Sequence, residues 1–311
     1  MVRIANRYFK IVDIKKEVMT ESGTFAPPRG FQKTGAKETN VIPVHERDDI
    51  EPITEGLEEK DRQFVTALAR GLELLRSFGL GEHYLGVTEL ARRTGIPKPS
   101  VSRLAGTLTK LGYLDYSESL GKYSLGVAVL SLGYAMLSNL DVRQVAKPLM
   151  QELAEFSRAS VSIGIRDQLS MVYVETIRSS APIALQRGIG ARLSLATTSL
   201  GRAYMAGLPE SERNFLMDHI RLHDEQQWPR IKAGIEQGFR DYADHGFCIS
   251  MGDWDKEIFA VGVPFRGADG SMMAFNCGGP AFVLTREKLE NDIGPRLVSL
   301  VKQVGSLMGQ I

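Results

Sequence analysis

Hydrophobic residues recur at helical intervals along the stretch that begins near Asp61. In DRQFVTALARGLELLRSF they are spaced by four, four and three residues, which predicts a helix with one apolar face. The segment VTELARRTG predicts a second, short helix, with Thr88 as its N-cap and Gly95 as its C-terminal stop. The apolar positions of the first helix are Phe64, Leu68, Leu72 and Leu75.

A third helix is predicted over PKPSVSRLAGTLTKLG, where two prolines occupy the entry and an apolar stripe follows at helical spacing. The next segment, YLDYSESLGKYSLG, has two short strand-like runs around a turn and predicts a β-hairpin. Helices followed by a hairpin in this order predict a winged helix-turn-helix. The stripe of the third helix consists of Val101, Leu104, Leu108 and Leu111.

The second half of the chain alternates strand-like and helical patterns. Short turns at 166–169 and 267–270 favour antiparallel neighbours, so the fold class expected here is α+β with a mainly antiparallel sheet. The predicted strands are SVSIGIR, MVYVETI, IALQRG, FCISMGD, FAVGVPF and MMAFNCGG. The predicted helices cover 141–158, 198–207, 210–222, 230–245 and 286–308.

These patterns divide the chain into four parts. Residues 1–60 have little periodicity and end in an acidic run, so we expect a poorly ordered extension. A winged helix-turn-helix is expected over 61–125, and a linker helix over 126–140. Residues 141–311 are expected to form a separate domain. The linker helix has Val127, Leu130, Tyr134 and Leu137 at helical spacing, and these are candidates for an assembly surface.

Composition narrows the class of protein. A chain of 311 residues is large enough for about two domains. The net charge of +1 provides no whole-chain attraction to nucleic acid or membrane. Two cysteines and no long apolar run favour a reducing cytoplasm and argue against a membrane anchor. No metal site, cofactor motif or nucleophile elbow is found, and His219 with His223 lacks a third ligand.

Positive charge is nevertheless concentrated between Thr88 and Gly112, where five basic residues accompany a single acidic one. Opposite the apolar stripe of the third helix, four polar residues repeat at the same spacing and form a face that fits the DNA major groove. An ordinary solvated helix face is the alternative. The polar face consists of Ser100, Arg103, Thr107 and Lys110. Lys98 and Ser100 are placed to reach bases, and Arg92, Arg93 and Lys110 to meet phosphates. Lys122 on the hairpin is placed to meet the adjacent backbone or the minor groove.

Several segments together resemble the isocitrate lyase regulator (IclR) family of bacterial transcription factors. They are TALARGLELLRSF, LARRTGIPKPSVSRLAGTLTKLGYL, KYSLG, LATTSLGRAYMAGL, GFCISMGDWDKEIFAVGVPF and FNCGGP. The resemblance covers 64–308 and implies a winged helix-turn-helix followed by a GAF-like effector-binding domain. It also implies that Thr88, Lys98, Ser100, Ser102 and Arg103 meet operator DNA.

The resemblance further implies an effector pocket in the second domain. Thr198 and Ser199 begin a predicted helix, whose free N–H groups attract an anion, although a plain N-cap is the alternative. The family pattern is broken at 252–255, where Trp254 is expected to form a pocket wall or to pack in the core. Cys277 is expected to be a buried or pocket-lining thiol rather than a nucleophile. The pocket residues implied by the resemblance are Thr197, Thr198, Ser199, Leu200, Asp253, Ala260, Asn276, Cys277 and Gly278, and Trp254 is added to them as a candidate.

The function expected from these features is a ligand-responsive transcription regulator in the cytoplasm, associated with the nucleoid. Its partners would be a pseudo-palindromic DNA operator and a small organic acid or aromatic metabolite, with no cofactor and no membrane. A homodimer is expected, because one winged helix offers little contact area, and the family resemblance implies a dimer of dimers. Two alternatives stay open: an enzyme acting on a small molecule, and a second domain that serves only for oligomerisation.

Overall fold

The computed structural model describes residues 64–79, 81–181 and 187–309. The expected extension over 1–60 and most of the expected strand IALQRG lie outside the described residues. Among the helices that are described, none has the length and apolar character required to cross a bilayer.

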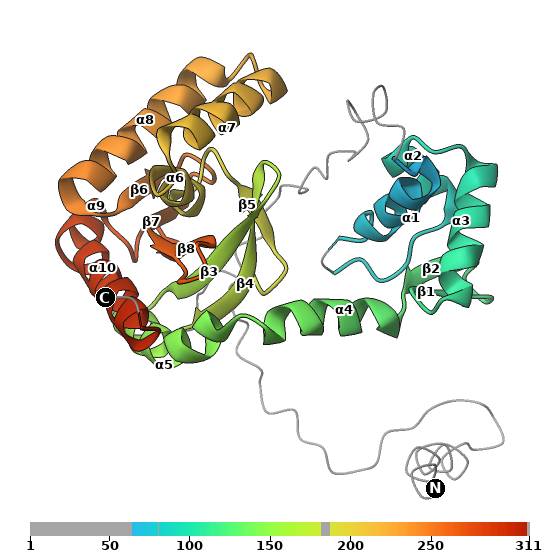
Figure 1. The fold of residues 1–311 in the computed structure, drawn as a ribbon, viewed down its shortest axis with the longest axis horizontal. Coiled ribbons are helices and arrows are strands. Elements are labelled where there is room, and N and C mark those ends of the chain that lie inside the picture. The colour runs from blue at the N-terminus through green and yellow to red at the C-terminus, as the bar shows by residue number, and fades with distance from the viewer. Residues whose placement is uncertain (1–63, 80, 182–186, 310–311) are drawn as a thin grey trace, which may run out of the picture. The chain divides into compact units, whose positions relative to one another are not determined.

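The first described part is a winged helix-turn-helix (Figure 1). Its elements are α1 (Thr66–Arg76), α2 (Val87–Thr94), α3 (Lys98–Lys110), β1 (Leu114–Ser117) and β2 (Lys122–Leu125). The two strands pair antiparallel, and Leu85 adds one bridge to Tyr123. The predicted helices and hairpin are thus confirmed.

The start of α2 differs from the prediction. Gly86, and not Thr88, precedes α2, which begins one residue before Thr88; the Thr88 side chain therefore lies in the first turn without a capping bond. Gly95 ends α2 in the left-handed conformation, with φ of 67°, as expected for a residue without a Cβ. The turn between α2 and α3 is therefore fixed by this glycine and the following Pro97.

The core of this part joins all three helices to the hairpin. It contains Leu74, Leu90, Val101 and Ala105, each of them fully buried. By contrast, the apolar stripe expected on α1 is largely outside the core, because Leu68 and Leu72 are exposed. One face of α1 therefore remains apolar and solvent-exposed within the chain.

The helix α4 (Val127–Ser138) follows the hairpin, where a helix was predicted. None of its residues is buried within the chain. Its first turn is fastened to the preceding part, because the amides of Gly126 and Ala128 donate to the carbonyls of Tyr113 and Gly112. The helix is thus well formed although little of its own surface is covered.

The second part is built on one six-stranded sheet (Figure 1). The strand order is β5-β4-β3-β8-β7-β6, and every neighbouring pair is antiparallel, which confirms the expected sheet. The strands are β3 (Ser160–Asp167), β4 (Ser170–Arg178), β5 (Arg192–Ser194), β6 (Cys248–Met251), β7 (Ile258–Arg266) and β8 (Met272–Pro280). The hairpins predicted at 166–169 and 267–270 join β3 to β4 and β7 to β8.

Helices cover both faces of this sheet and give two apolar cores. One core packs α5 (Asp141–Ser157) and α10 (Gly294–Leu307) against the sheet, with Phe275 at its centre. The other packs α6 (Ser199–Ala206), α7 (Glu210–His223) and α8 (Trp228–His245) against the opposite side. The expected C-terminal helix over 286–308 is divided into α9 (Arg286–Lys288), a π-helical turn η2 (Leu289–Ile293) and α10.

The helix α6 approaches the sheet closely. Gly262 on β7 makes this approach possible, because a Cβ at this position would lie 2.3 Å from the carbonyl oxygen of Ser199. The N-terminal turn of α6 is thereby held directly over the central strands. This placement creates the cavity described below.

Candidate DNA-binding surface and effector cavity

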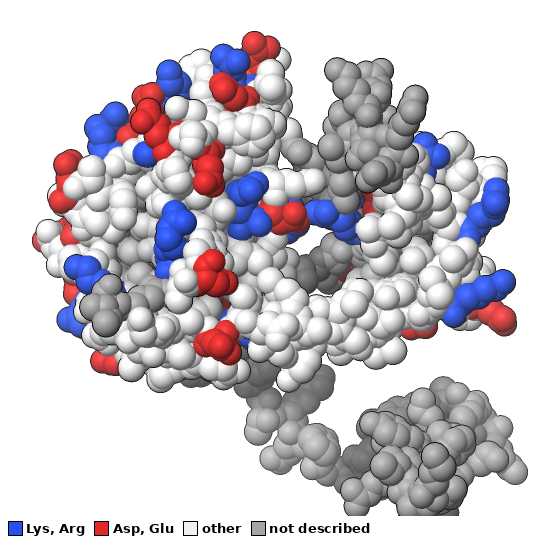
Figure 2. Space-filling model, in the orientation of Figure 1, with Lys and Arg blue, Asp and Glu red and all other residues white. Residues whose placement is uncertain are grey.

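The outer face of α3 is polar, basic and exposed. Ser102, Arg103, Thr107 and Lys110 are exposed along it, whereas Ser100 is half-buried at its start. Lys98 is exposed at the first residue of α3. Figure 2 shows basic side chains along the outer edge of this helix and of the hairpin. Within the described residues, the side chains of Lys98, Arg103 and Lys110 form no ion pair.

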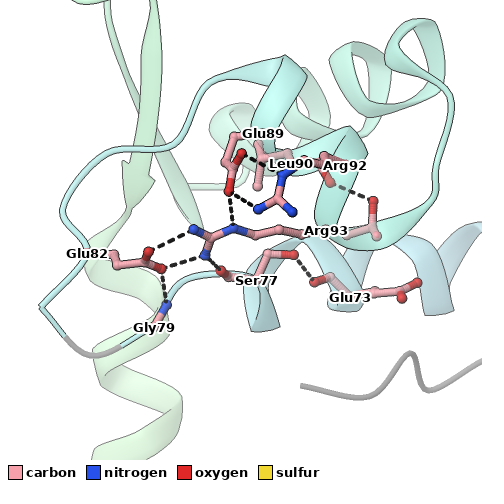
Figure 3. A network of polar contacts seen from close by, with 9 residues as sticks. Glu73, Ser77, Gly79, Glu82, Glu89, Leu90, Arg92 and Arg93 are labelled. Carbon is pink, nitrogen blue, oxygen red and sulfur yellow. Dashed lines mark hydrogen bonds and ion pairs between the residues drawn. The ribbon is translucent and has the colours of Figure 1, made fainter. Parts of the chain in front are cut away.

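Arg93 lies in a network inside the winged helix-turn-helix instead of projecting from it (Figure 3). Its guanidinium donates to both carboxylate oxygens of Glu82, to Glu89 and to the carbonyl of Ser77 at 2.9 Å. The hydrogen bonds that Arg93 donates to Glu82 are the main cause that raises the pKa of Arg93 above its already high usual value. The arginine therefore joins the end of α1 to α2.

Arg92 takes part in the same network from a more exposed position. It donates to both oxygens of Glu89, at 3.0 and 2.7 Å. Hydrogen bonds from Arg92 and Arg93 lower the pKa of Glu89 to about 2. Thr88 is exposed on the same helix, and Lys122 is exposed at the start of β2. The charged candidates of the two helices therefore differ: Arg92 and Arg93 on α2 are in ion pairs, whereas Lys98, Arg103 and Lys110 on α3 are in none among the described residues.

A cavity lies between the N-terminus of α6 and the sheet in the second part. Residues from β4, β5, β6, β7 and β8, and from two connecting segments, form its walls. Its volume is about 30 Å³, which is space for about two water molecules. The lining residues are Tyr173, Arg187, Leu193, Thr198, Ser199, Leu200, Ser250, Trp254, Ile258, Ala260, Asn276 and Gly278.

Two polar atoms in this lining are buried without a partner among the described residues: Ser199 Oγ and Asn276 Oδ1. The amide of Asn276 is held by Tyr173, because its Nδ2 donates to the phenol oxygen at 3.2 Å. Burial raises the pKa of Tyr173, so the phenol stays protonated at neutral pH. An unpaired buried polar atom is costly, so these two atoms are candidates for hydrogen bonds to a group bound in the cavity.

The start of α6 adds positive potential to the same cavity. Thr198 is the N-cap: its hydroxyl accepts from the amide of Gly201 at 3.1 Å. Among the described residues, no hydrogen bond involves the amides of Ser199 and Leu200. Arg187 lies over the ring of Trp254, with 5.4 Å between the guanidinium carbon and the ring centroid. The helix terminus and the guanidinium together favour an anionic group.

Seven of the ten residues expected in the pocket do line this cavity: Thr198, Ser199, Leu200, Trp254, Ala260, Asn276 and Gly278. The other three have different surroundings. The carbonyl of Thr197 accepts a bond from Ser250, and the carboxylate of Asp253 pairs with Arg202. Cys277 is in the core on the α5 side, where its thiol contacts Ser157 and burial raises its pKa to about 12.

The sequence did not indicate five of the lining residues. Tyr173 and Ser250 are on expected strands and Ile258 directly precedes one, but periodicity does not say which face covers a cavity. Leu193 belongs to β5, a strand of three residues that was not expected. Arg187 lies beside the range 182–186, outside any described element. Only the sheet order brings these residues together.

No group of three potential metal ligands exists among the described residues. His219, one of the two histidines considered for a metal, has its Nδ1 2.8 Å from the carbonyl oxygen of Phe215. The lining of the cavity also contains no pair of groups arranged for nucleophilic catalysis. The cavity has the chemistry of a binding site.

Two family models match the chain. Residues 67–118 match the IclR helix-turn-helix domain, and residues 134–305 match the bacterial transcriptional regulator IclR C-terminal domain. A curated relative, the HTH-type transcriptional regulator TsaQ1/TsaQ2 of Comamonas testosteroni, is 31% identical over 256 residues. The match covers 81% of this chain and 91% of that protein.

Solved structures agree with these matches. An IclR family transcriptional regulator from Brucella abortus is 50% identical, with a TM-score of 0.74, and covers 81% of this chain and 95% of its own. An IclR homologue from Microbacterium hydrocarbonoxydans, complexed with 4-hydroxybenzoate, has the same fold at 17% identity. Its TM-score is 0.59 over 78% of this chain and 98% of its own. The chain is therefore a transcriptional regulator of the IclR family, with a helix-turn-helix DNA-binding domain and a C-terminal effector-binding domain.

Proposed function

We propose that this regulator reads a pseudo-palindromic operator with α3 and senses a small carboxylic acid, with an apolar or aromatic body, in the α6 cavity. The unpaired cations of α3 carry the first half of this proposal. An arginine that already binds two carboxylates must break those bonds to contact a phosphate, whereas an unpaired exposed cation has no such bonds to lose. Arg103 and Lys98 are therefore the preferred DNA contacts.

The roles of the candidate residues follow from this distinction. Lys98, Ser100, Ser102, Arg103 and Thr107 reach base edges and backbone from the N-terminal and central turns of α3. Lys110 and Lys122 contact flanking phosphates. Arg93 supports the turn that presents α3, and Arg92 and Thr88 lie at the edge of the interface. Operator recognition thus depends on α3 more than on α2.

Operator titrations at fixed salt test this assignment. The DNA is a fragment from upstream of the gene, with the protected sequence defined by footprinting. Arg103→Ala is expected to weaken binding more than about tenfold, with unchanged thermal unfolding. Arg240→Ala removes an exposed arginine of α8 that bonds only to Gln237 in the described structure, and should bind DNA as the parent protein does. Equal affinity of Arg103→Ala and parent contradicts the assignment.

Recognition of two half-sites requires at least a dimer, and we propose that α1 and α4 form its interface. Val127, Leu130 and Tyr134 on α4 are 76%, 69% and 69% exposed. Leu68 and Leu72 give α1 a similar apolar face. Exposed apolar side chains grouped on a helix in this way are typical of an interface between protein chains. A dimer of dimers is proposed for the complete assembly.

The effector proposal depends on the unpartnered polar atoms of the cavity. Ser199 Oγ and the α6 amides supply donors for a carboxylate, and Arg187 adds positive charge. Leu193, Leu200 and Ile258 provide an apolar surface for the body of the ligand. Asn276 Oδ1 needs a donor, which a hydroxyl group of the ligand can supply.

A thermal-shift screen tests the effector proposal. The first probe is 4-hydroxybenzoate, with which the Microbacterium hydrocarbonoxydans homologue is complexed. Other small aromatic and aliphatic carboxylates complete the panel. We expect at least one of these compounds to raise the unfolding temperature of the parent protein, and to raise that of Asn276→Leu by less. A panel without any effect favours a purely oligomeric role for the second domain.

A further inference from the structure

Arg202 is a charged residue in the interior of the effector-binding domain. It lies on α6 with only 3% of its surface exposed. Its Nη1 donates to the carboxylate of Asp253 at 2.9 Å and to the carbonyl of Ile249 at 3.2 Å, and its Nε donates to the carbonyl of Ala196. A buried guanidinium is tolerated when it is paired and hydrogen-bonded in this way.

Helix α8 packs against α6 (Figure 1) and leaves room for this side chain. Two of its glycines face Arg202. A Cβ at Gly234 would lie 2.3 Å from Arg202 Nη2, and a Cβ at Gly238 would lie 3.0 Å from its Cδ. Both contacts are closer than ordinary packing allows, so α8 leaves a groove in which the arginine is fixed.

Asp253, the partner of Arg202, belongs to the loop between β6 and β7. The same loop is held a second time, because Arg230 of α8 donates to the carbonyl of Asp253 at 3.0 Å. The residue before it, Gly252, has φ of +75°, which directs the chain into this turn. Trp254 follows directly and lines the cavity. Neither Arg202 nor Asp253 is among the lining residues of the described cavity.

Arg202 thereby joins two walls of the cavity. The carbonyl of Ala196 belongs to the turn before α6, and Asp253 belongs to the loop that carries Trp254. Ser250 makes a parallel link between these segments, since its hydroxyl donates to the carbonyl of Thr197. Loss of the ion pair therefore leaves the Trp254 loop with fewer attachments.

We infer that Arg202 and Asp253 are positioning residues that fix Trp254 as a wall of the effector cavity. The functional meaning of this inference rests on the proposed effector site, but the positioning itself does not. Asp253 acts through its loop and does not contact the effector. Replacing its carboxylate by an amide preserves its shape and removes the counter-charge of Arg202.

The test uses the emission of Trp254 in the full-length protein without added ligand. The chain has two tryptophans, so Trp228→Phe leaves Trp254 as the reporter. In this background, Asp253→Asn is expected to shift the emission to longer wavelength and to increase acrylamide quenching roughly twofold, as local opening exposes the indole. Far-ultraviolet circular dichroism and operator affinity should be unchanged.

Two further variants complete the test. Arg202→Met in the same background should have the same effect, and the double variant should add nothing, because the pair acts as a unit. Arg240→Gln on α8 is the matched control and should leave Trp254 emission unchanged. Unchanged emission and quenching in Asp253→Asn overturn the inference, as does an equal change in the control. Since no ligand is present, these outcomes are independent of the thermal-shift screen that tests the effector site.

Discussion

The Arg93 guanidinium binds Glu82 through two nitrogens, and one of them also donates to the carbonyl of Ser77. This arrangement fastens the connection after α1 to the α2 helix that precedes the recognition helix (Figure 3). Arg93 is therefore part of the framework that presents α3. The basic side chains of α3, by contrast, form no ion pair among the described residues, and we propose the DNA contacts there.

The first prediction concerns the two classes of arginine. Arg93→Met is expected to destabilise the winged helix-turn-helix by about 1–2 kcal/mol, because Glu82 and the Ser77 carbonyl lose a partly buried donor. Arg103→Ala should leave the unfolding transition in place. Hydrogen exchange of the α1 and α2 amides measures the difference. Equal protection in Arg93→Met and in the parent protein would show that the network contributes little.

The second prediction concerns the stability of the folded protein at low pH. Arg92 and Arg93 lower the pKa of Glu89 from its usual 4.5 to about 2, so the folded state binds this proton less readily than the unfolded chain. The stabilising contribution of Glu89 is complete above about pH 5 and is lost as the pH falls toward about 2. Glu89→Gln should therefore lose less stability on acidification than the parent. Parallel unfolding profiles for the two proteins over this pH range would refute the prediction.

The winged helix-turn-helix was predictable because its information is local. The spacing of Val101 and Leu104 sets the buried side of α3, and Arg103 follows on the opposite side. The role of Arg93 was not predictable, since its partner Glu82 lies outside the helix and beyond the reach of periodicity. Sequence spacing predicts which side chains share one face of a helix. Which charged side chains are free of ion pairs depends on partners elsewhere in the fold.

The third prediction concerns the size of the effector. The cavity measures about 30 Å³, so a ligand with several non-hydrogen atoms requires a wall to move. Trp254→Ala supplies this space directly. We expect the ratio of affinities for large over small aromatic carboxylates to rise roughly tenfold, as measured by calorimetry. A ratio equal to that of the parent protein would show that Trp254 does not limit ligand size.

The fourth prediction concerns assembly through α4. Leu130→Glu places a charge on an exposed apolar helix and should weaken the dimer by at least about tenfold. Sedimentation velocity over a concentration series measures the change. Leu222→Glu is the control, because Leu222 is 75% exposed on α7 and lies away from the proposed interface. Identical sedimentation of Leu130→Glu and the parent would exclude α4 from the interface.

The effector cavity was only partly predictable. The start of α6 follows from the sequence, since Thr198 and Ser199 precede a helical pattern. Tyr173 joins the site because β3 lies between β4 and β8, which allows Asn276 to reach its phenol across the sheet. Asp253 was expected in the pocket, yet its carboxylate is bound by Arg202, which lies 51 residues earlier. Contacts of this kind depend on the order of the strands in the sheet, which the local sequence pattern does not predict.

Control of operator affinity by the cavity is most directly tested by titrating labelled operator DNA in the presence and absence of the carboxylate that gives the largest thermal shift. We expect the dissociation constant of the parent protein to change by at least about fivefold, a typical coupling between two sites. Asn276→Leu should bind the same operator without a response to the ligand. An operator affinity that is unaffected by a bound carboxylate would contradict the account.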